Sequence, residues 1–194
     1  MDKRIYNGIL IGILVISLAL LFFSNVNAIT GRATEGSTYS NVTIEKYLAI
    51  EMSPNLSAGI DFGTIETLGV DNYNATENYN GTSNSTLYWI TVSEDSNTAV
   101  DLCTRANAPM ANAGGAEIPL VNESFASNVT VSDLNDPSLS NAIDYTTNYQ
   151  EGHFDVPVGN TSYWRFWLDA PLGQETGNYN NTIYFQGSNV GSGC

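Results

Sequence analysis

The residue type with the clearest chemistry in this chain is asparagine in the triplet Asn-x-Ser/Thr. After residue 28 the chain has 20 asparagines and 34 serines or threonines. Chance would place roughly four such triplets there, whereas nine occur without Pro in the middle position. Each is an acceptor for an N-linked glycan in an exported protein, although a chain simply rich in Asn, Ser and Thr turns is the alternative. The predicted acceptors are Asn41, Asn55, Asn74, Asn80, Asn84, Asn122, Asn128, Asn160 and Asn180.

Cysteine gives the second chemical signal. The chain has only two, Cys103 and Cys194. In an oxidising compartment such a pair usually forms a disulfide. Closing a loop of about ninety residues would contribute roughly 4 kcal/mol on the chain-entropy estimate. The alternative is that Cys194 bonds a neighbouring subunit.

Catalysis and metal binding have little support in the sequence. His153 is the only histidine, and without a neighbouring motif it is expected in a solvated loop. Asp95, Asn97 and Asp101 could bind Ca²⁺, but Asp-x-Asn is more typical of a turn. Lys46, the only lysine after residue 28, could form an isopeptide bond with an Asn or Asp, although snorkelling to a sheet edge is expected more often. We therefore expect no catalytic residue, metal or cofactor.

The first 28 residues have the pattern of a secretory signal peptide. A short charged region precedes the apolar run Ile9–Phe23, and Val26-Asn-Ala28 offers the small residues after which a signal peptidase cuts. The run is shorter than the roughly 20 residues that span a bilayer, which disfavours a retained anchor. A type IV pilin leader with a retained helix from Ile9 is a further alternative. We expect cleavage after Ala28, a secreted or cell-surface product, and contact with the membrane only during export.

Charge narrows the choice of partners. From Ile29 onward, 19 acidic residues face four basic ones. A surface with no basic patch cannot neutralise phosphates, so nucleic acid is excluded as a partner. Strong negative charge instead keeps an extracellular protein soluble.

The stretch from Tyr163 to Phe185 should position the core. Trp164, Phe166 and Leu168 alternate with Tyr163, Arg165 and Trp167, which is the period of a pleated strand, and Ile183 to Phe185 alternates again. Pro171 and Gly177 lie between these two runs. The pattern predicts a β-hairpin that has aromatic side chains on both faces.

Other short segments also indicate strands. Val42–Met52 alternates over eleven residues with Val42, Ile44, Lys46, Leu48 and Ile50 on one face. A broken strand is expected at Ile60–Ile65, a glycosylated loop at Gly69–Thr86, and strands at Leu87–Val92, Ala99–Arg105 and Phe154–Val158, with weaker ones at Ile118–Val121 and Val129–Leu134. The sequence therefore predicts an all-β, antiparallel, jelly-roll-like β-sandwich at residues 41–194, after an N-terminal extension at residues 29–40.

Several of these segments together resemble the sandwich domain of archaeal extracellular filament proteins of the bundling-pilin type, which are similar to the TasA and camelysin proteins of bacteria. The resemblance covers most of the chain after the leader. The residues that carry it are Gly59–Ile65, Tyr88–Val92, Ser96-Asn97, Val100-Asp101, Tyr163–Leu168, Pro171, Gly177–Tyr179 and Ile183.

The resemblance implies a filament of copies of this chain, in which the N-terminal segment of one subunit fills a missing strand position in the next. The donor would lie within Ile29–Met52, either in residues 29–40 or in 41–52. The expected subunit contacts are Ile29, Val42, Ile44, Leu48, Ile50, Tyr163 and Trp167. A monomeric adhesin or carbohydrate-binding module, with exposed Trp89 or Trp167 as a stacking platform, is the alternative function.

Overall fold

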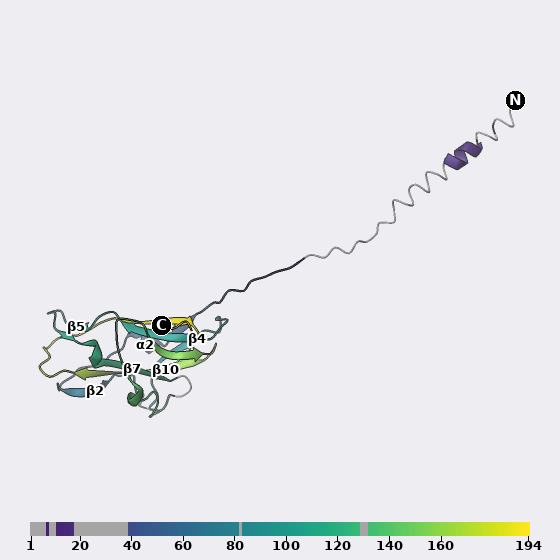
Figure 1. Cartoon of the computed structure of the whole chain (residues 1–194). Coiled ribbons are helices and arrows are strands. Elements are labelled where there is room, and N and C mark those ends of the chain that lie inside the picture. The colour runs from purple at the N-terminus through teal and green to yellow at the C-terminus, as the bar shows by residue number, and fades with distance from the viewer. Residues whose placement is uncertain (1–6, 8–10, 18–38, 82, 129–131) are drawn as a thin grey trace. The chain divides into compact units, whose positions relative to one another are not determined.

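A computed structural model describes residues 7, 11–17, 39–81, 83–128 and 132–194 of the chain (Figure 1). Residues 11–17 are helical and expose their apolar side chains. Among the described residues, no helix is both long and apolar enough to cross a membrane. Cleavage after Ala28 and the predicted contact at Ile29 lie outside the described residues. Ile44–Cys194 forms one compact unit.

Two packed antiparallel sheets make up this unit, as expected for a sandwich-like β fold (Figure 1). The larger sheet has the order β1-β3-β10-β7-β8, and β2 also pairs with β10. Its strands are β1 (Ile50–Met52), β2 (Val70–Asn74), β3 (Tyr88–Val92), β7 (Glu123–Asn128), β8 (Ile143–Asp144) and β10 (Thr161–Ala170). The smaller sheet has the order β11-β4-β9, and its strands are β4 (Val100–Ala106), β9 (Gln150–Val156) and β11 (Ile183–Asn189).

Short elements lie in the connections between these strands. The strands β5 (Met110–Ala111) and β6 (Glu117–Ile118) pair with each other. The other short elements are the helix α2 (Pro54–Ala58) and the 3₁₀ turns η1 (Leu120–Asn122) and η2 (Leu139–Asn141). The side chain of Ser53 caps α2 by accepting a hydrogen bond from the Leu56 amide, and Pro54 takes the first helical position. The sequence analysis missed this helix, although Ser-Pro is a recognisable start signal.

The core lies between the sheets, where the inward face of β10 packs as predicted. Trp164 and Phe166 are fully buried and Leu168 is 3% exposed. Trp164 meets Phe185 of β11 edge-on at 5.3 Å between ring centroids. Gly152 of β9 lies directly over the indole, where a Cβ atom would come within 1.9 Å of a ring carbon. Only glycine therefore lets the two sheets approach so closely at this point.

The predicted hairpin from Tyr163 to Phe185 is wrong, because its two strands belong to different sheets. β10 pairs with β7 along one edge and with β3 and β2 in succession along the other, so neither edge is free for β11. β11 pairs with β4 instead. The connection that contains Pro171 and Gly177 crosses from one layer to the other.

The predicted eleven-residue strand at Val42–Met52 is also mostly wrong, because only Ile50–Met52 pairs with β3. β3 ends at Val92 and the chain then turns at residues 93–97. Beyond β1, single backbone hydrogen bonds remain, from the Ser93 N–H to the Ala49 carbonyl at 2.9 Å and from the Asn97 N–H to the Tyr47 carbonyl at 3.2 Å. In this turn, the side chain of Asn97 makes hydrogen bonds to the segment before β1 in place of a paired strand. The Asn97 amide accepts from the Tyr47 backbone N–H at 2.8 Å and donates to the Glu45 carbonyl at 2.8 Å.

The weaker strand predictions were partly wrong as well. Ile60–Ile65 is irregular, with Gly63 at a positive φ of 66°. The loop predicted at Gly69–Thr86 contains β2, and Ile118–Val121 ends in η1 after β6. Of the strand expected at Val129–Leu134, residues 129–131 lie outside the described part and residues 132–134 are not in a strand. The strand in this region is β7, which ends at Asn128. β3, β4 and the Asp95–Asn97 turn lie where they were predicted.

Arg165 organises the outer face of β10, opposite the core. It is fully buried, and the Tyr79 ring lies 4.2 Å from the guanidinium carbon. Among the residues that the structure describes, the guanidinium donates only to backbone carbonyls, which belong to two separate loops. These carbonyls are those of Asn78, Asn84, Asp133, Leu134 and Pro137. One side chain thereby fastens both loops over the sheet.

Asn78 completes the same arrangement at the gap between β3 and β2. Its side-chain amide accepts from the Phe166 N–H at 2.9 Å and donates to the Phe166 carbonyl at 2.6 Å, as a neighbouring strand would. Thr86 donates to the Trp164 carbonyl at 2.6 Å. The edge of β10 is therefore satisfied where no strand pairs with it.

Cys103 and Cys194 form the predicted disulfide within one chain, with 5.6 Å between their Cα atoms. Cys103 belongs to β4, and Cys194 follows the end of β11. The bond therefore joins the C-terminal end of the described chain to the middle strand of the smaller sheet.

Replacing Arg165 with Leu should lower the free energy of unfolding by about 3 kcal/mol or more, because several buried carbonyls would lose their donor. Urea unfolding followed by tryptophan fluorescence measures the loss. Arg105→Leu is the matched control, since Arg105 stacks on the Tyr149 and Tyr184 rings and should cost only about 1 kcal/mol. Equal losses for the two variants would contradict the role assigned to Arg165.

Candidate interaction groove

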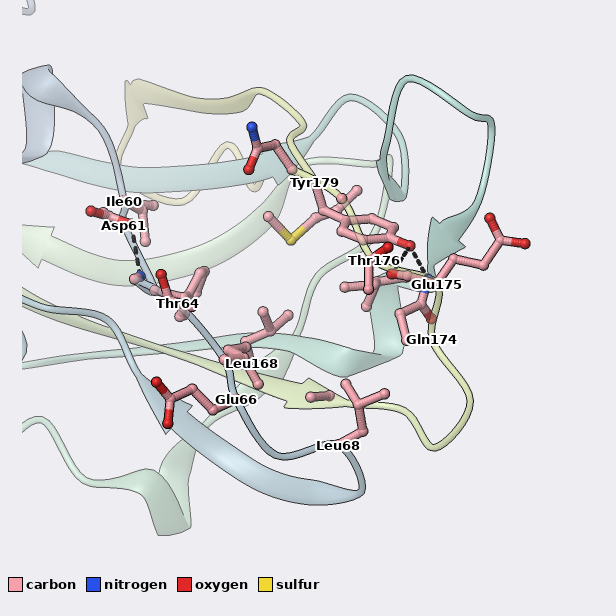
Figure 2. A pocket seen from close by; sticks show the side chains of 18 residues that line it. Ile60, Asp61, Thr64, Glu66, Leu68, Leu168, Gln174, Glu175, Thr176 and Tyr179 are labelled. Atoms are coloured by element: carbon pink, nitrogen blue, oxygen red, sulfur yellow. Dashed lines mark hydrogen bonds between the residues drawn. The ribbon is translucent and has the colours of Figure 1, made fainter.

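A groove runs along one end of the sandwich, between the irregular segment 59–66 and the chain that leads into β11. Its larger part has a volume of about 550 Å³, and its smaller part has about 330 Å³. Ile60, Met110 and Tyr179 line both parts, so the two lie next to each other. Figure 2 shows the larger part, with Ile60, Asp61 and Thr64 on one wall and Gln174, Thr176 and Tyr179 on the other.

Apolar side chains line both parts of the groove, and the charged side chains in it are acidic. Leu168 and Ile118 line the larger part, and Leu56, Ile183 and Phe185 line the smaller. The ionisable side chains that line it among the described residues, apart from Tyr179, are four carboxylates. These are Asp61, Glu66, Glu123 and Glu175. A guest with apolar side chains and a positive charge is therefore complementary to this groove.

The wall formed by Tyr179 is fixed by hydrogen bonds. The phenol donates to the Glu175 carbonyl at 2.8 Å and accepts from the side-chain amide of Gln174 at 2.8 Å (Figure 2). It also accepts from the side-chain amide of Asn112 at 3.2 Å. On the other wall, the Asp61 carboxylate accepts from the Gly63 amide at 2.7 Å. Both walls are held in place before any guest enters.

β11 borders the smaller part of the groove and forms the edge of its sheet. It pairs with β4 on one side, and its other edge makes no backbone ladder with any segment among the described residues. Ile183 and Phe185, which line the groove, belong to this strand. An unpaired edge beside an apolar groove can accept a further strand.

Glu123 is the least expected residue in the groove. It is 2% exposed, and its carboxylate accepts from the Asn181 side-chain amide at 2.7 Å. Burial raises the pKa of Glu123 to about 7, and the hydrogen bond from Asn181 offsets part of that shift. Sequence reasoning missed both residues. The sequence did contain a pattern that indicates the burial of Glu123, because this residue alternates with Phe125 on the inward face of β7.

The predicted subunit contacts fall into three groups. Val42 and Ile44 are about 80% exposed and belong to no strand. Leu48 and Ile50 pack against the core, so they are used within the subunit. Tyr163 is half-buried.

Trp167 does not fit its predicted place at a subunit contact, because it is only 2% exposed. The chain itself already covers its ring, so the side chain has no free surface to offer a neighbour. The same burial removes it as a sugar-stacking platform, and Trp89 is half-buried.

Every predicted glycan acceptor remains accessible to some degree. Five are exposed, namely Asn41, Asn74, Asn84, Asn160 and Asn180, and the half-buried ones are Asn55, Asn80, Asn122 and Asn128. Thr86 and Ser162, the hydroxyl residues of two of these triplets, are buried. Glycan transfer to Asn84 and Asn160 is therefore expected before the domain folds, and occupancy at all nine sites stays a prediction.

The remaining chemical candidates have structural roles. Asp101 is buried, and its carboxylate accepts from the backbone amides of Asp155 and Gly191, each at 2.8 Å. In the part of the chain that the structure describes, no group of three acidic, His or Cys side chains could hold a metal ion. His153 lies in β9 rather than in a loop, where burial lowers its pKa.

No protein-family profile and no curated protein matches this sequence.

The pKa of Glu123 makes folding stability depend on pH. The folded state holds the proton more tightly than the unfolded state, whose ordinary pKa is 4.5. The stabilisation is complete below that pH and is lost as the pH rises through about 7, a change of about 3 kcal/mol. Glu123→Gln keeps the shape of the side chain and should remove this dependence, which urea titrations between the two pH values can measure. An unchanged pH slope in the variant would contradict the assignment.

Proposed function

We propose that this protein is a non-enzymatic structural subunit of an extracellular filament, in which the N-terminal segment of one copy occupies the groove of the next. The observation that carries the proposal is the unpaired edge of β11 beside the groove. A guest strand would pair with this edge through main-chain hydrogen bonds and place alternate side chains in the groove. Repetition of such a head-to-tail contact gives an open filament.

The donor segment is best assigned to the part of Ile29–Met52 that precedes Leu48. Residues 48–52 are held by the core and by β3. Val42 and Ile44, in contrast, alternate along an exposed segment without a partner strand. An apolar segment exposed in the monomer and buried in a neighbour would gain the stabilisation of a core strand.

Other features fit an exported filament. The leader pattern, the nine glycan acceptors and the disulfide all suit an oxidising, extracytoplasmic location. The proposal also includes a jelly-roll-like β-sandwich whose partners are copies of itself and N-linked glycans. Nucleic acid is not among the proposed partners.

The test is a pair of substitutions on opposite faces of the donor segment. Ile44→Asp places a charge in the apolar groove, which should weaken each junction by about 3 kcal/mol, roughly 100-fold in affinity. Filaments sheared from cells and viewed by negative-stain electron microscopy should then be lost. Because Ile44 is 81% exposed, the thermal unfolding of the monomer should not change.

Tyr47→Asp is the matched control. Tyr47 is also exposed, at 57%, but alternation places it on the opposite face, so filaments should persist. Filaments of wild-type length from Ile44→Asp, or no filaments from the wild type, would overturn the proposal.

A further inference from the structure

We propose that Lys46 of one subunit forms an isopeptide bond with Asn181 of the next, with Glu123 beside it as the proton-transfer group. The inference rests on the proposed filament and adds a covalent modification site to it. Lys46 and Asn181 would be joined side chain to side chain, so each junction would survive denaturation.

The acceptor pair is already assembled within one subunit. The Asn181 amide nitrogen donates to the Glu123 carboxylate at 2.7 Å and to the Ala108 carbonyl at 3.2 Å, which fixes the orientation of the amide. Both Asn181 and Glu123 line the smaller part of the groove. A carboxyl group that titrates near neutral pH can both accept and return a proton.

The reaction needs no oxidant and no added reagent. When the Lys46 ammonium enters the apolar groove, it transfers a proton to the Glu123 carboxylate, which leaves a neutral amine and a carboxylic acid. The amine nitrogen attacks the Asn181 carbonyl carbon, and a C–N bond forms. Glu123 passes its proton to the departing nitrogen, and the original C–N bond breaks. The attacking nitrogen gives up one of its two protons and keeps the other as the new amide N–H, so ammonia leaves with the released proton as ammonium and Glu123 is again a carboxylate.

Lys46 has the position and chemistry that such a donor requires. It is exposed, and it is the only lysine after residue 28. It alternates with Ile44 on one face of the donor segment, so a strand that buries Ile44 in the groove also directs Lys46 inward. The four carboxylates that line the groove favour a cation there.

The bond can form only between subunits. Asn97 holds the backbone on either side of Lys46 beside the turn after β3. Along β10, Thr161 pairs with Thr91 near that turn, whereas Leu168 pairs with Glu123. Thr161 and Leu168 are seven residues apart along β10, a distance of roughly 23 Å. A lysine side chain cannot span that distance. The same separation places donor and acceptor at opposite ends of the subunit, as head-to-tail contact requires.

The experiment is electrophoresis of purified filaments, boiled in detergent with a reductant, followed by mass spectrometry of tryptic peptides. The wild type should give a ladder of multimers and a branched peptide that joins Lys46 to Asn181, lighter than its two parents by one ammonia. Lys46→Arg keeps the charge but cannot form the bond, so its filaments should dissociate completely to monomers. Glu123→Gln should slow bond formation by roughly 100-fold or more.

Asn181→Ala should also abolish the ladder, and it leaves the Asn180-x-Thr182 triplet intact. Asn148→Ala, at an exposed position outside the groove, is the control that should retain the ladder. Wild-type filaments that dissociate to monomers of unmodified mass would overturn the isopeptide bond while leaving the filament proposal standing. Complete absence of filaments would overturn both.

Discussion

The fold depends on the hydrogen bonds made by one buried cation, the guanidinium of Arg165. Arg165 lies on the outer face of the longest strand, and no carboxylate bonds to it within the described part of the chain. A guanidinium removed from water must have its N–H groups occupied, and here the backbone carbonyls of two loops occupy them. These loops therefore have to cross the larger sheet, and Trp167, which follows on the same face of β10, is buried as well. This part of the outer face of β10 therefore offers no free surface, whereas the two ends of the sandwich carry the groove and the exposed segment that precedes Leu48.

Those two ends differ in chemistry. At one end, Ser96 and Asn97 hold residues 45–49 beside the turn after β3. At the other end lies a preformed acidic groove beside an unpaired strand edge. In the proposed filament these two surfaces would meet in a heterologous contact, which does not close on itself as a symmetric dimer does. The placement of these two surfaces at opposite ends of the sandwich follows from the length of β10 and from the point at which the chain turns after β3.

Alternation of residues predicted part of this arrangement well. The inward face of β10, the positions of β3 and β4 and the two-layer β fold followed from it, whereas the disulfide was predicted from the presence of only two cysteines and an oxidising compartment. Pairing partners did not, because alternation says which face a residue takes and not which strand lies beside it. The hairpin was wrong for that reason. The burial of Arg165 and Trp167 depends on loops distant in sequence, and the groove depends on how the irregular segment 59–66 lies against the entry to β11.

The disulfide changes how this domain would respond to a pulling force. In a head-to-tail filament, tension would act between the N-terminal segment of a subunit and its β11, where the neighbour's strand is bound. Without the disulfide, the backbone from β1 to β11 would carry that force, and all the strands between them could be unfolded and extended. With Cys103 bonded to Cys194, the covalent path passes from β4 directly to the end of β11. Residues 104–182 are then bypassed, including the central strand β10, so a subunit could lengthen only through its first strands.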